Sequence, residues 1–332
     1  MKKKVTYANS GVSVDKGDQF VKTIQPFIKK TLTNDVVGST TSFAALYSLE
    51  KKQNYNRPIL VACTDGVGTK IELGTKTNKI KNLGEDLVAM CINDLICTGA
   101  SPLFFLDYLS TSKLEIKYHS KIIKGITEGC IKSKCSLIGG ETAEMPGTYK
   151  SKDFDLAGFA VGIVVRKDLI DSKKIKKGDL LIGIRSNGIH SNGYSLIRKL
   201  FFDKKKKYLR DTKFVNALMR PTRIYFNLIN RIKKKVKIKG IAHITGGGLL
   251  GNIPRIIPEN LDFDLYQDSW HTPQIFNIIS EHSKLSTQEM LSIYNMGIGM
   301  VICIEEKELA NLNKSFKLLK EKFYVIGRVK SR

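Results

Sequence analysis

The chain has 332 residues, enough for about two domains, and its 42% hydrophobic and 26% charged residues are typical of a globular protein with a sizeable core. It contains no run near the ~18 consecutive apolar residues of a membrane span, and its basic N-terminus MKKKVTYANSG lacks the apolar segment of a signal peptide, so we expect a cytoplasmic protein without a membrane partner. The net charge of +24 favours anionic ligands, but the lysines are spread along the chain without an RNA-binding or zinc-finger pattern, so we expect no dedicated nucleic-acid partner.

Strand and helix patterns alternate through the first half of the chain. Apolar runs predict strands, and apolar residues at helical spacing predict helices. The predicted strands cover 58–64, 102–109, 135–140 and 155–165, and the predicted helices cover 82–98 and 115–133. Five of the six cysteines lie in these stretches, and no CxxC pair is present, so we expect reduced core thiols.

The second half has the same alternation after a lapse of apolar periodicity at about 166–180. The predicted strands cover 179–185, 240–245, 262–266, 299–305 and 323–329, and the predicted helices cover 192–202, 222–235, 248–257, 273–282 and 306–321. Interspersed strands and helices predict an α+β (mixed α/β) fold. We therefore expect two domains, 1–168 and 169–332, each a sheet covered by helices.

The segment TDGVGTK follows the first predicted strand, so Asp65 stands where a strand ends. Gly66 and Gly68 allow a ligand to approach the backbone closely, and Lys70 adds a charge suited to phosphate. The spacing is not that of a P-loop. A hairpin turn explains the same residues, since Asp-Gly is common in turns.

The segment NDLICTGASP carries Asp94 near the end of the predicted helix 82–98, because Gly99 and Pro102 stop the helix. A carboxylate is disfavoured near the negative end of the helix dipole. Two interpretations follow: the Asn93–Asp94 pair faces water, or Asp94 holds a cation that reverses the penalty.

The segment SLIGGETAEMPGTY repeats this arrangement, with Glu141 directly after Gly139 and Gly140 at a strand end. Magnesium binds carboxylates together with phosphate oxygens and water. Three acidic residues beside glycines therefore predict a magnesium-phosphate site with Asp65, Asp94 and Glu141 as metal ligands.

Two glycine-rich segments of the second half, SNGIHSNGYSL and AHITGGGLLGNIP, offer further ligand contacts. Ser191 or Asn192 can cap the helix that follows, and His190 precedes them as an acid/base or substrate-contact candidate. Residues 246–248 lead from a strand into a helix, a usual setting for phosphate binding. His243 lies within the strand and is either a core residue or a substrate contact.

The stretch from Asp94 to Pro102 reads D-x4-G-A-x-P and resembles the ATP-binding signature of the aminoimidazole ribonucleotide synthetase superfamily. The finer resemblance is to its phosphoribosylformylglycinamidine cyclo-ligase family, and it runs in the family's order from about residue 7 to residue 304. It rests on TDGVGTK, DLVAMCINDLICTGASPLFFLDY, GCIKSKCSLIGGETAEMPGTY, DLAGFAVGIV, HSNGYSLIRK, RPTRIY, HITGGG and NMGIGM.

The resemblance implies an ATP- and Mg²⁺-dependent ligase of purine biosynthesis. Formylglycinamidine ribonucleotide would be the substrate, phosphorylated on its formyl oxygen and closed to aminoimidazole ribonucleotide with release of phosphate. Phosphoryl transfer needs cations around the developing charge, and ring closure within one bound substrate needs mainly positioning. The resemblance also implies a homodimer, whose interface is formed by the N-terminal domains.

The resemblance assigns roles to residues at matching positions. It implies His190, Lys70 and Asp94 as catalytic residues, with Lys70 on an ATP phosphate. The implied nucleotide contacts are Asp65, Gly66, Gly68, Thr69, Lys70, Asn93, Asp94, Gly140, Glu141 and Thr142. The implied substrate contacts are His190, Ser191, Asn192, His243, Thr245, Gly246 and Gly247.

Two segments depart from the family pattern. Residues 38–45 read GSTTSFAA, with serine and threonine where glycines are common, which affects the expected nucleotide contacts of that loop. The segment 200–215 is shorter and more basic than is typical of the family, but it lies outside the motifs. We therefore expect little effect on the chemistry.

Overall fold

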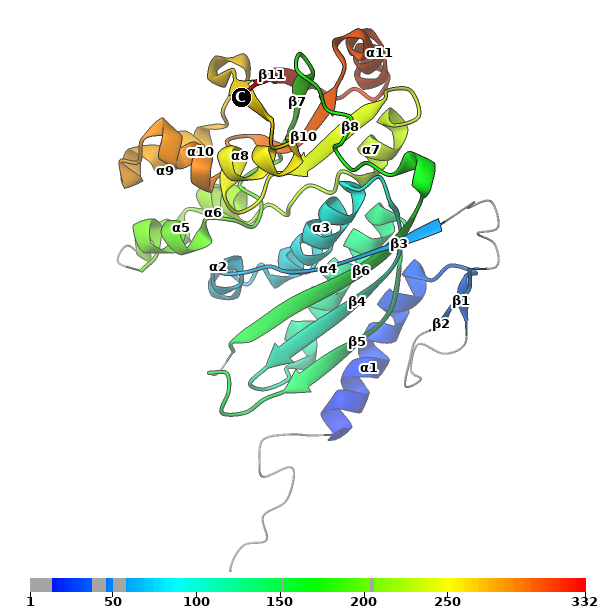
Figure 1. Ribbon diagram of the computed structural model, residues 1–332. Helices are drawn as coiled ribbons and strands as arrows, with labels where there is room; N and C mark the ends of the chain where they lie inside the picture. The colour runs from blue at the N-terminus through cyan, green and yellow to red at the C-terminus, as the bar shows by residue number, and fades with distance from the viewer. Residues whose placement is uncertain (1–13, 38–45, 50–57, 151, 204–205) are drawn as a thin grey trace, which may run out of the picture.

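Two sheets, one from each half of the chain, form the framework of the computed structural model (Figure 1). The structure describes residues 14–37, 46–49, 58–150, 152–203 and 206–332. The expected departure at residues 38–45 lies outside the described residues. No helix among the described residues is both long and apolar enough to cross a membrane.

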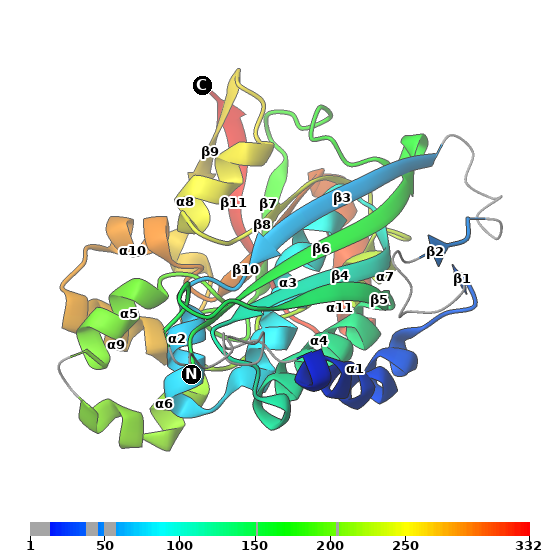
Figure 2. The ribbon, with the colours of Figure 1, turned by 90° about the horizontal axis from the view of Figure 1, so that it is seen from below.

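The first half forms a four-stranded sheet of order β3-β6-β4-β5, in which β4 and β5 are parallel and the other pairs are antiparallel. Helices α3 and α4 cover one face of this sheet (Figures 1 and 2). The strands are β3 (Pro58–Gly66), β4 (Ser101–Thr111), β5 (Ser136–Glu144) and β6 (Phe154–Val165), with a separate pair β1 (Val36–Val37) and β2 (Leu46–Tyr47). The helices are α1 (Val14–Ile28), η2 (Lys29–Thr31), α2 (Lys70–Thr77), α3 (Ile80–Ile96) and α4 (Ile116–Ser133).

The second half forms a five-stranded antiparallel sheet of order β8-β10-β7-β11-β9. Its strands are β7 (Leu180–Arg185), β8 (Ile238–His243), β9 (Leu261–Leu265), β10 (Ile298–Ile304) and β11 (Phe323–Ser331). The helices are α5 (Tyr194–Phe201), α6 (Thr212–Leu218), α7 (Phe226–Ile232), α8 (Gly248–Asn252), α9 (Gln274–Ser283), α10 (Thr287–Ile293) and α11 (Leu309–Leu318). Short 3-10 helices are η4 (Arg166–Asp168), η5 (Lys206–Arg210), η6 (Ile253–Ile256), η7 (Gln267–Ser269) and η8 (Glu306–Glu308).

The mixed α/β fold with two sheets is confirmed, and each of the nine predicted strands is present. The sequence prediction missed α1, which contains Gly17 and Pro26, and the helices α2, α6 and α10, which have at most eight residues each. The predicted helix 248–257 is confirmed at its start but is too long, because α8 ends at Asn252 and residues Ile253–Ile256 form a 3-10 helix. Helix α10 begins with a capping box of Ser286 and Glu289, a sequence signal that would have located it.

Helix α3 is buried on most of its surface because it has neighbours on several sides. It packs on β3, β4 and β6 of the first sheet, on α4, and on α7 and β8 of the second half. A helix that is apolar around most of its circumference requires such an environment. The side chains of α3 that are polar and still buried therefore face specific partners, and these partners define the candidate site.

Candidate active site

Asp65 and Asp94 bring two carboxylates together on the helix-covered side of the first sheet. Asp65 is the second-to-last residue of β3, and its Oδ1 accepts a hydrogen bond from the Gly66 amide at 2.7 Å. Burial raises the pKa of Asp65, and the negative charge of Asp94 raises this pKa further. Two carboxylates that repel each other in this way are stabilised by a cation between them. The pair therefore fits the hard, oxygen-seeking cation that the sequence predicts.

His243, the last residue of β8, holds Asp94 from the opposite half of the chain. Its Nδ1 lies 2.8 Å from Asp94 Oδ1, and its imidazole is buried while 42% of the Asp94 side chain is exposed. The arrangement leaves one side of the Asp94 carboxylate available to a ligand. The sequence left open whether His243 is a core residue, and the structure makes it a buried partner of a half-exposed acid.

Asn93 determines which nitrogen of His243 carries the proton. The Asn93 amide oxygen accepts from the Tyr225 N–H at 3.0 Å, and its Nδ2 donates to the Arg223 carbonyl at 2.8 Å, which fixes the orientation of the amide. The same Nδ2 lies 3.3 Å from His243 Nε2, which must therefore accept. In the neutral imidazole the proton is then on Nδ1, which donates to Asp94. Asn93 is fully buried, so the interpretation that the Asn93–Asp94 pair simply faces water is wrong for Asn93.

Glu141 lies on the other face of the first sheet. Asp65 pairs with Gly158, and Gly158 pairs with Asp107, so these residues share the helix-covered face. Glu141 pairs with Tyr108, one position along the strands, and successive side chains point to opposite faces. Among the described residues no three His, Cys, Asp or Glu side chains are grouped closely enough to hold a metal. The expected three-carboxylate site is therefore not formed within the described chain.

Lys70 does not have the place that the sequence predicts for a phosphate ligand. It is the first residue of α2, it is completely buried, and its Nζ donates to Asp86 Oδ1, the His190 carbonyl and the Arg220 carbonyl, each at 2.9 Å. These three bonds use every N–H of the ammonium group. As described, Lys70 has no donor left for a phosphate oxygen and instead joins the two halves of the chain.

Asp86 is the acceptor at the centre of this junction, and sequence reasoning missed it. Its Oδ1 also accepts from Thr222 N and Oγ1, both at 2.7 Å, and from Ser191 Oγ at 3.1 Å. Asp86 and Asn93 are seven residues apart, which places them on one face of α3. Two polar residues at this spacing within an apolar helix were the signal that could have identified the face in contact with the second half.

His190 is buried rather than exposed on its glycine-rich loop. Burial lowers the pKa of its imidazole well below the usual value, and the charges of neighbouring His243, Lys70 and Arg223 act in the same direction. The ring is therefore neutral at physiological pH. Its φ of 70° lies in the left-handed region, a strained conformation for a residue other than glycine. Ser191 is also buried, where it donates to Asp86.

Asn192 and the loop 245–247 form the accessible part of the second half near this site. A Cβ added to Gly246 would lie 3.3 Å from Asn192 Oδ1, so the two predicted substrate-binding segments are side by side. Gly246 and Gly247 are exposed, while Thr245 and Asn192 are half-buried. Helix α8 has five residues, and a helix this short gives the expected phosphate site little dipole.

Of the remaining predicted nucleotide contacts, Gly68 and Thr69 have accessible backbones. Gly68 has a φ of 69°, and a Cβ there would meet nothing within 4 Å, so the space above it is open. Gly140 has a different reason to be glycine, since a Cβ there would lie 2.5 Å from Asp107 Oδ1. Gly66 and Thr142 are half-buried at strand ends.

Comparison with known proteins places both halves of the chain among AIR synthase related proteins. Residues 33–164 match the model of the AIR synthase related protein N-terminal domain, and residues 176–332 match the model of the corresponding C-terminal domain. The phosphoribosylformylglycinamidine cyclo-ligase of Thermoanaerobacter pseudethanolicus is 46% identical over 331 residues, which cover 98% of this chain and 97% of that protein.

Two solved structures share the fold at low sequence identity. The thiamine-monophosphate kinase of Stenotrophomonas maltophilia superposes with a TM-score of 0.70 at 17% identity, covering 93% of this chain and 94% of that one. A hydrogenase maturation protein HypE in complex with ATP gives a TM-score of 0.68 at 13% identity, covering 95% of this chain and 86% of that one. These likenesses concern the fold.

Proposed function

Because the chain belongs to the phosphoribosylformylglycinamidine cyclo-ligase family of AIR synthase related proteins, we propose that Asp65, Asp94 and the glycine loops around them form its ring-closing site. The protein is a ligase that cyclises formylglycinamidine ribonucleotide to aminoimidazole ribonucleotide in purine biosynthesis. The reaction consumes ATP and releases ADP and phosphate. The observation that carries the site assignment is the half-exposed Asp94 carboxylate, oriented by buried His243 and set against Asp65.

The steps of the ring-closing reaction explain why a site without a covalent nucleophile is sufficient for catalysis. The formyl oxygen of the substrate is a poor leaving group until it takes the terminal phosphoryl group of ATP. The amidine nitrogen then attacks the activated carbon, a C–N bond closes the imidazole ring, and the oxygen leaves with phosphate. No covalent bond to the protein is required, so positioning and charge stabilisation provide the catalysis.

We assign the cation-binding role to Asp65 and Asp94. Magnesium, when bound, would neutralise the charge that develops on the transferred phosphoryl group. His243 would keep the Asp94 carboxylate in one orientation by donating through Nδ1, and Asn93 would keep His243 in the required tautomer.

The nucleotide and the substrate would contact different segments. Gly66, Gly68 and Thr69 would offer backbone groups to the nucleotide, as would Gly140, Glu141 and Thr142 on β5. Asn192 and Thr245–Gly247 would contact the substrate, because these segments are accessible and adjacent. His190, Ser191 and Lys70 are buried, and we assign them the role of positioning these loops rather than contacting the reacting atoms.

A homodimer through the first sheet is part of the proposal. Helices cover one face of this sheet, and the other face carries Leu60 and Phe159, which are 59% and 42% exposed. Exposed apolar side chains on an open sheet face are typical of an interface. Glu141 lies on this same face, so a nucleotide at the interface would reach it.

We further propose that the boundary between the two domains lies at 168/169. The first domain would bind the nucleotide and form the dimer, and the second would lie on the substrate side. This boundary falls between the two matched family models, which end at 164 and begin at 176. We propose the cytoplasm as the compartment, and the six cysteines, all free thiols, suit its reducing conditions.

The direct test uses the purified protein with ATP, Mg²⁺ and formylglycinamidine ribonucleotide. We expect formation of aminoimidazole ribonucleotide in proportion to ADP release. Folded protein that forms no product would overturn the proposal for the site and its substrate together.

A further inference from the structure

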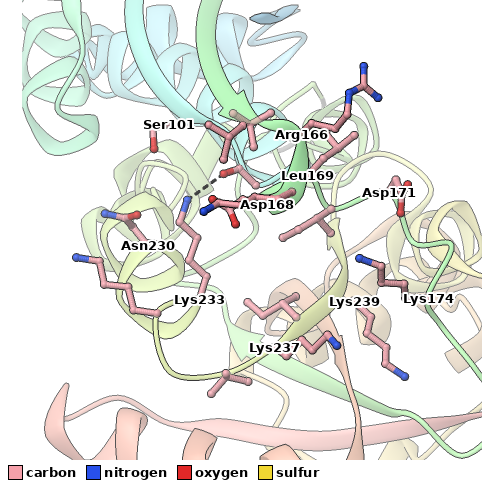
Figure 3. A pocket seen from close by; sticks show the side chains of 18 of the residues that line it. Ser101, Arg166, Asp168, Leu169, Asp171, Lys174, Asn230, Lys233, Lys237 and Lys239 are labelled. Atoms are coloured by element: carbon pink, nitrogen blue, oxygen red, sulfur yellow. Dashed lines mark hydrogen bonds between the residues drawn. The ribbon is translucent and has the colours of Figure 1, made fainter. Parts of the chain in front are cut away.

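A cavity of about 890 Å³ lies away from the candidate active site, where the linker between the halves passes over α7 and β8. Its walls are the end of β6, residues 166–171 of the linker, the α7–β8 connection, and Gly99 and Ser101 between α3 and β4 (Figure 3). This volume is within the usual range for a small-molecule site. None of the residues assigned above to nucleotide, substrate or cation lines it.

Positive side chains dominate the lining of this cavity. Seven lysine or arginine residues face two acidic residues, and the lining cations are Arg166, Lys167, Lys174, Lys233, Lys234, Lys237 and Lys239. Figure 3 shows Lys233 beside Asp168 on one side and Lys174 and Lys237 on the other, whereas Arg166 points away.

These cations differ in whether protein groups already satisfy them. Lys239 pairs with Asp179 and Glu305, so its charge is neutralised within the fold. Lys174, Lys234 and Lys237 are exposed and have no ion-pair or hydrogen-bond partner in the described part of the chain. A surface that only needed solubility would gain nothing from grouping these side chains around a concavity, where they repel one another.

The fold holds the Lys233 side chain in place at the cavity. Its Nζ donates to the Gly99 carbonyl at 2.9 Å, which draws the side chain across the joint between the two halves. Burial lowers the pKa of Lys233, while Asp168 opposes that shift. An anion placed between Lys233 and the exposed lysines would compensate for this partial loss of hydration.

The cavity also has an apolar floor. Ile163, Val164 and Val236 line it and are each at most 3% exposed. A ligand with phosphate at one end and a flat, weakly polar group at the other matches cations at the rim and aliphatic side chains below. We propose that this cavity binds a nucleotide carrying two or more phosphates, as a site separate from the catalytic one.

Photo-crosslinking with 8-azido-ADP, followed by peptide mapping, tests both the ligand and its position. We expect label on peptides within 163–174 or 230–239 of the full-length protein. The double variant Lys174→Glu/Lys237→Glu should lose at least about tenfold of this label, because four units of charge change at the rim. Its turnover should remain that of the wild type. The matched control Lys121→Glu/Lys124→Glu carries the same charge change on exposed lysines of α4 and should label normally.

Competition separates the possible sources of the phosphate chemistry. Inorganic triphosphate should displace the probe less effectively than unlabelled ADP if the apolar floor binds the base. Label confined to peptides around 65–70 and 139–142 would overturn the proposal, as would equal labelling of both double variants. An RNA oligomer would also overturn the proposal if it displaced the probe at a lower concentration than ADP does, both counted per phosphate group. That result would identify a nucleic-acid surface instead.

Discussion

Asp94 combines partial exposure, a like-charged neighbour and a fixed hydrogen-bond donor. Exposure gives a ligand access, the charge of Asp65 favours a cation, and the Nδ1–H of His243 limits the orientations of the carboxylate. Each of these properties occurs on ordinary protein surfaces. Their combination on one side chain, between two halves of a chain, is what a cation site for phosphoryl transfer requires.

Asp94→Asn should lower turnover by at least about 100-fold, because loss of even an outer partner of a metal ligand costs 10–100-fold. The amide is isosteric and keeps an acceptor for His243, so the thermal unfolding midpoint should change little. Steady-state kinetics with circular dichroism measures both. The control is Asp268→Asn, an exposed acid outside the site, and near-normal turnover of Asp94→Asn would remove its assigned role.

Asp107 should make stability depend on pH. Burial raises its pKa from 3.8 to about 7, so between these values the folded state keeps a proton that the unfolded state has released. The free energy of unfolding should therefore fall as the pH rises from about 4 to 7, by on the order of 4 kcal/mol. Asp107→Asn should remove this fall and be more stable than the wild type at pH 8.

Urea unfolding at several pH values provides the measurement for Asp107. Asp268→Asn, at an exposed position, should keep the pH dependence of the wild type. A parallel dependence in Asp107→Asn and the wild type would show that Asp107 ionises normally in the folded state.

The sequence predicted ligand-contacting positions for both Asp94 and Lys70, and the structure leaves Asp94 half-exposed but buries Lys70, for a physical reason. The position of Asp94 follows from local signals, a helix stop within five residues. The burial of Lys70 depends on Asp86, 16 residues away, and on carbonyl groups 120 and 150 residues away. A lysine beside a glycine loop gives the same local pattern whether its ammonium group faces a phosphate or a buried carboxylate.

At the scale of elements, α3 and α4 approach each other closely because glycines remove side chains from their contact. A Cβ on Gly84 would lie 2.1 Å from the Ile122 carbonyl oxygen, and a Cβ on Gly125 would lie 1.9 Å from that of Lys81. Backbone atoms cannot move aside as flexible side chains do. The sequence predicted both helices, but helical propensity disfavours these glycines, and only the contact explains them.

Gly125→Ala should therefore lower the free energy of unfolding by about 3 kcal/mol, the upper range for overpacking a core. Gly17→Ala is the matched control, since a Cβ there meets nothing within 4 Å and alanine favours a helix. Chemical denaturation measures the two variants together. A loss in Gly125→Ala no larger than the change in the control would contradict the close contact.

The contact between α2 and α3 depends on the buried pair of Lys70 and Asp86. Lys70→Met should lower the free energy of unfolding by about 3–5 kcal/mol, because it leaves a buried carboxylate without its cation. Adding Asp86→Asn should restore part of this loss, as expected for two residues in one network. Denaturation of both single variants and the double variant measures the coupling, and additive losses would show that the pair does not interact.

At the scale of the whole molecule, the open face of the first sheet and the charge of +24 act against each other. Like charge disfavours association of two copies, and burial of apolar side chains such as Leu60 and Phe159 favours it. Because screening weakens repulsion between exposed charges, association should strengthen as salt is added. The sequence could not reveal which face is open, because alternation alone does not say where the helices pack.

Phe159→Glu should convert the proposed dimer to a monomer, since it places a charge on the face that carries Leu60 and Phe159. Sedimentation velocity at several protein concentrations measures the change. Leu318→Glu is the matched control, because Leu318 on α11 is 84% exposed and outside the sheet. Dissociation of both variants, or of neither, would place the interface elsewhere.

The position of α3 has a consequence for any attempt to divide the protein. The helix belongs to the first half by chain order, but Asp86, Asn93 and Asp94 are satisfied by groups from the second half. A polypeptide cut at the linker would expose Asp86 and Asn93 to water on one fragment and leave their hydrogen-bond partners unpaired on the other. The two fragments would therefore have to be produced together, with each serving as the template on which the other completes its folding.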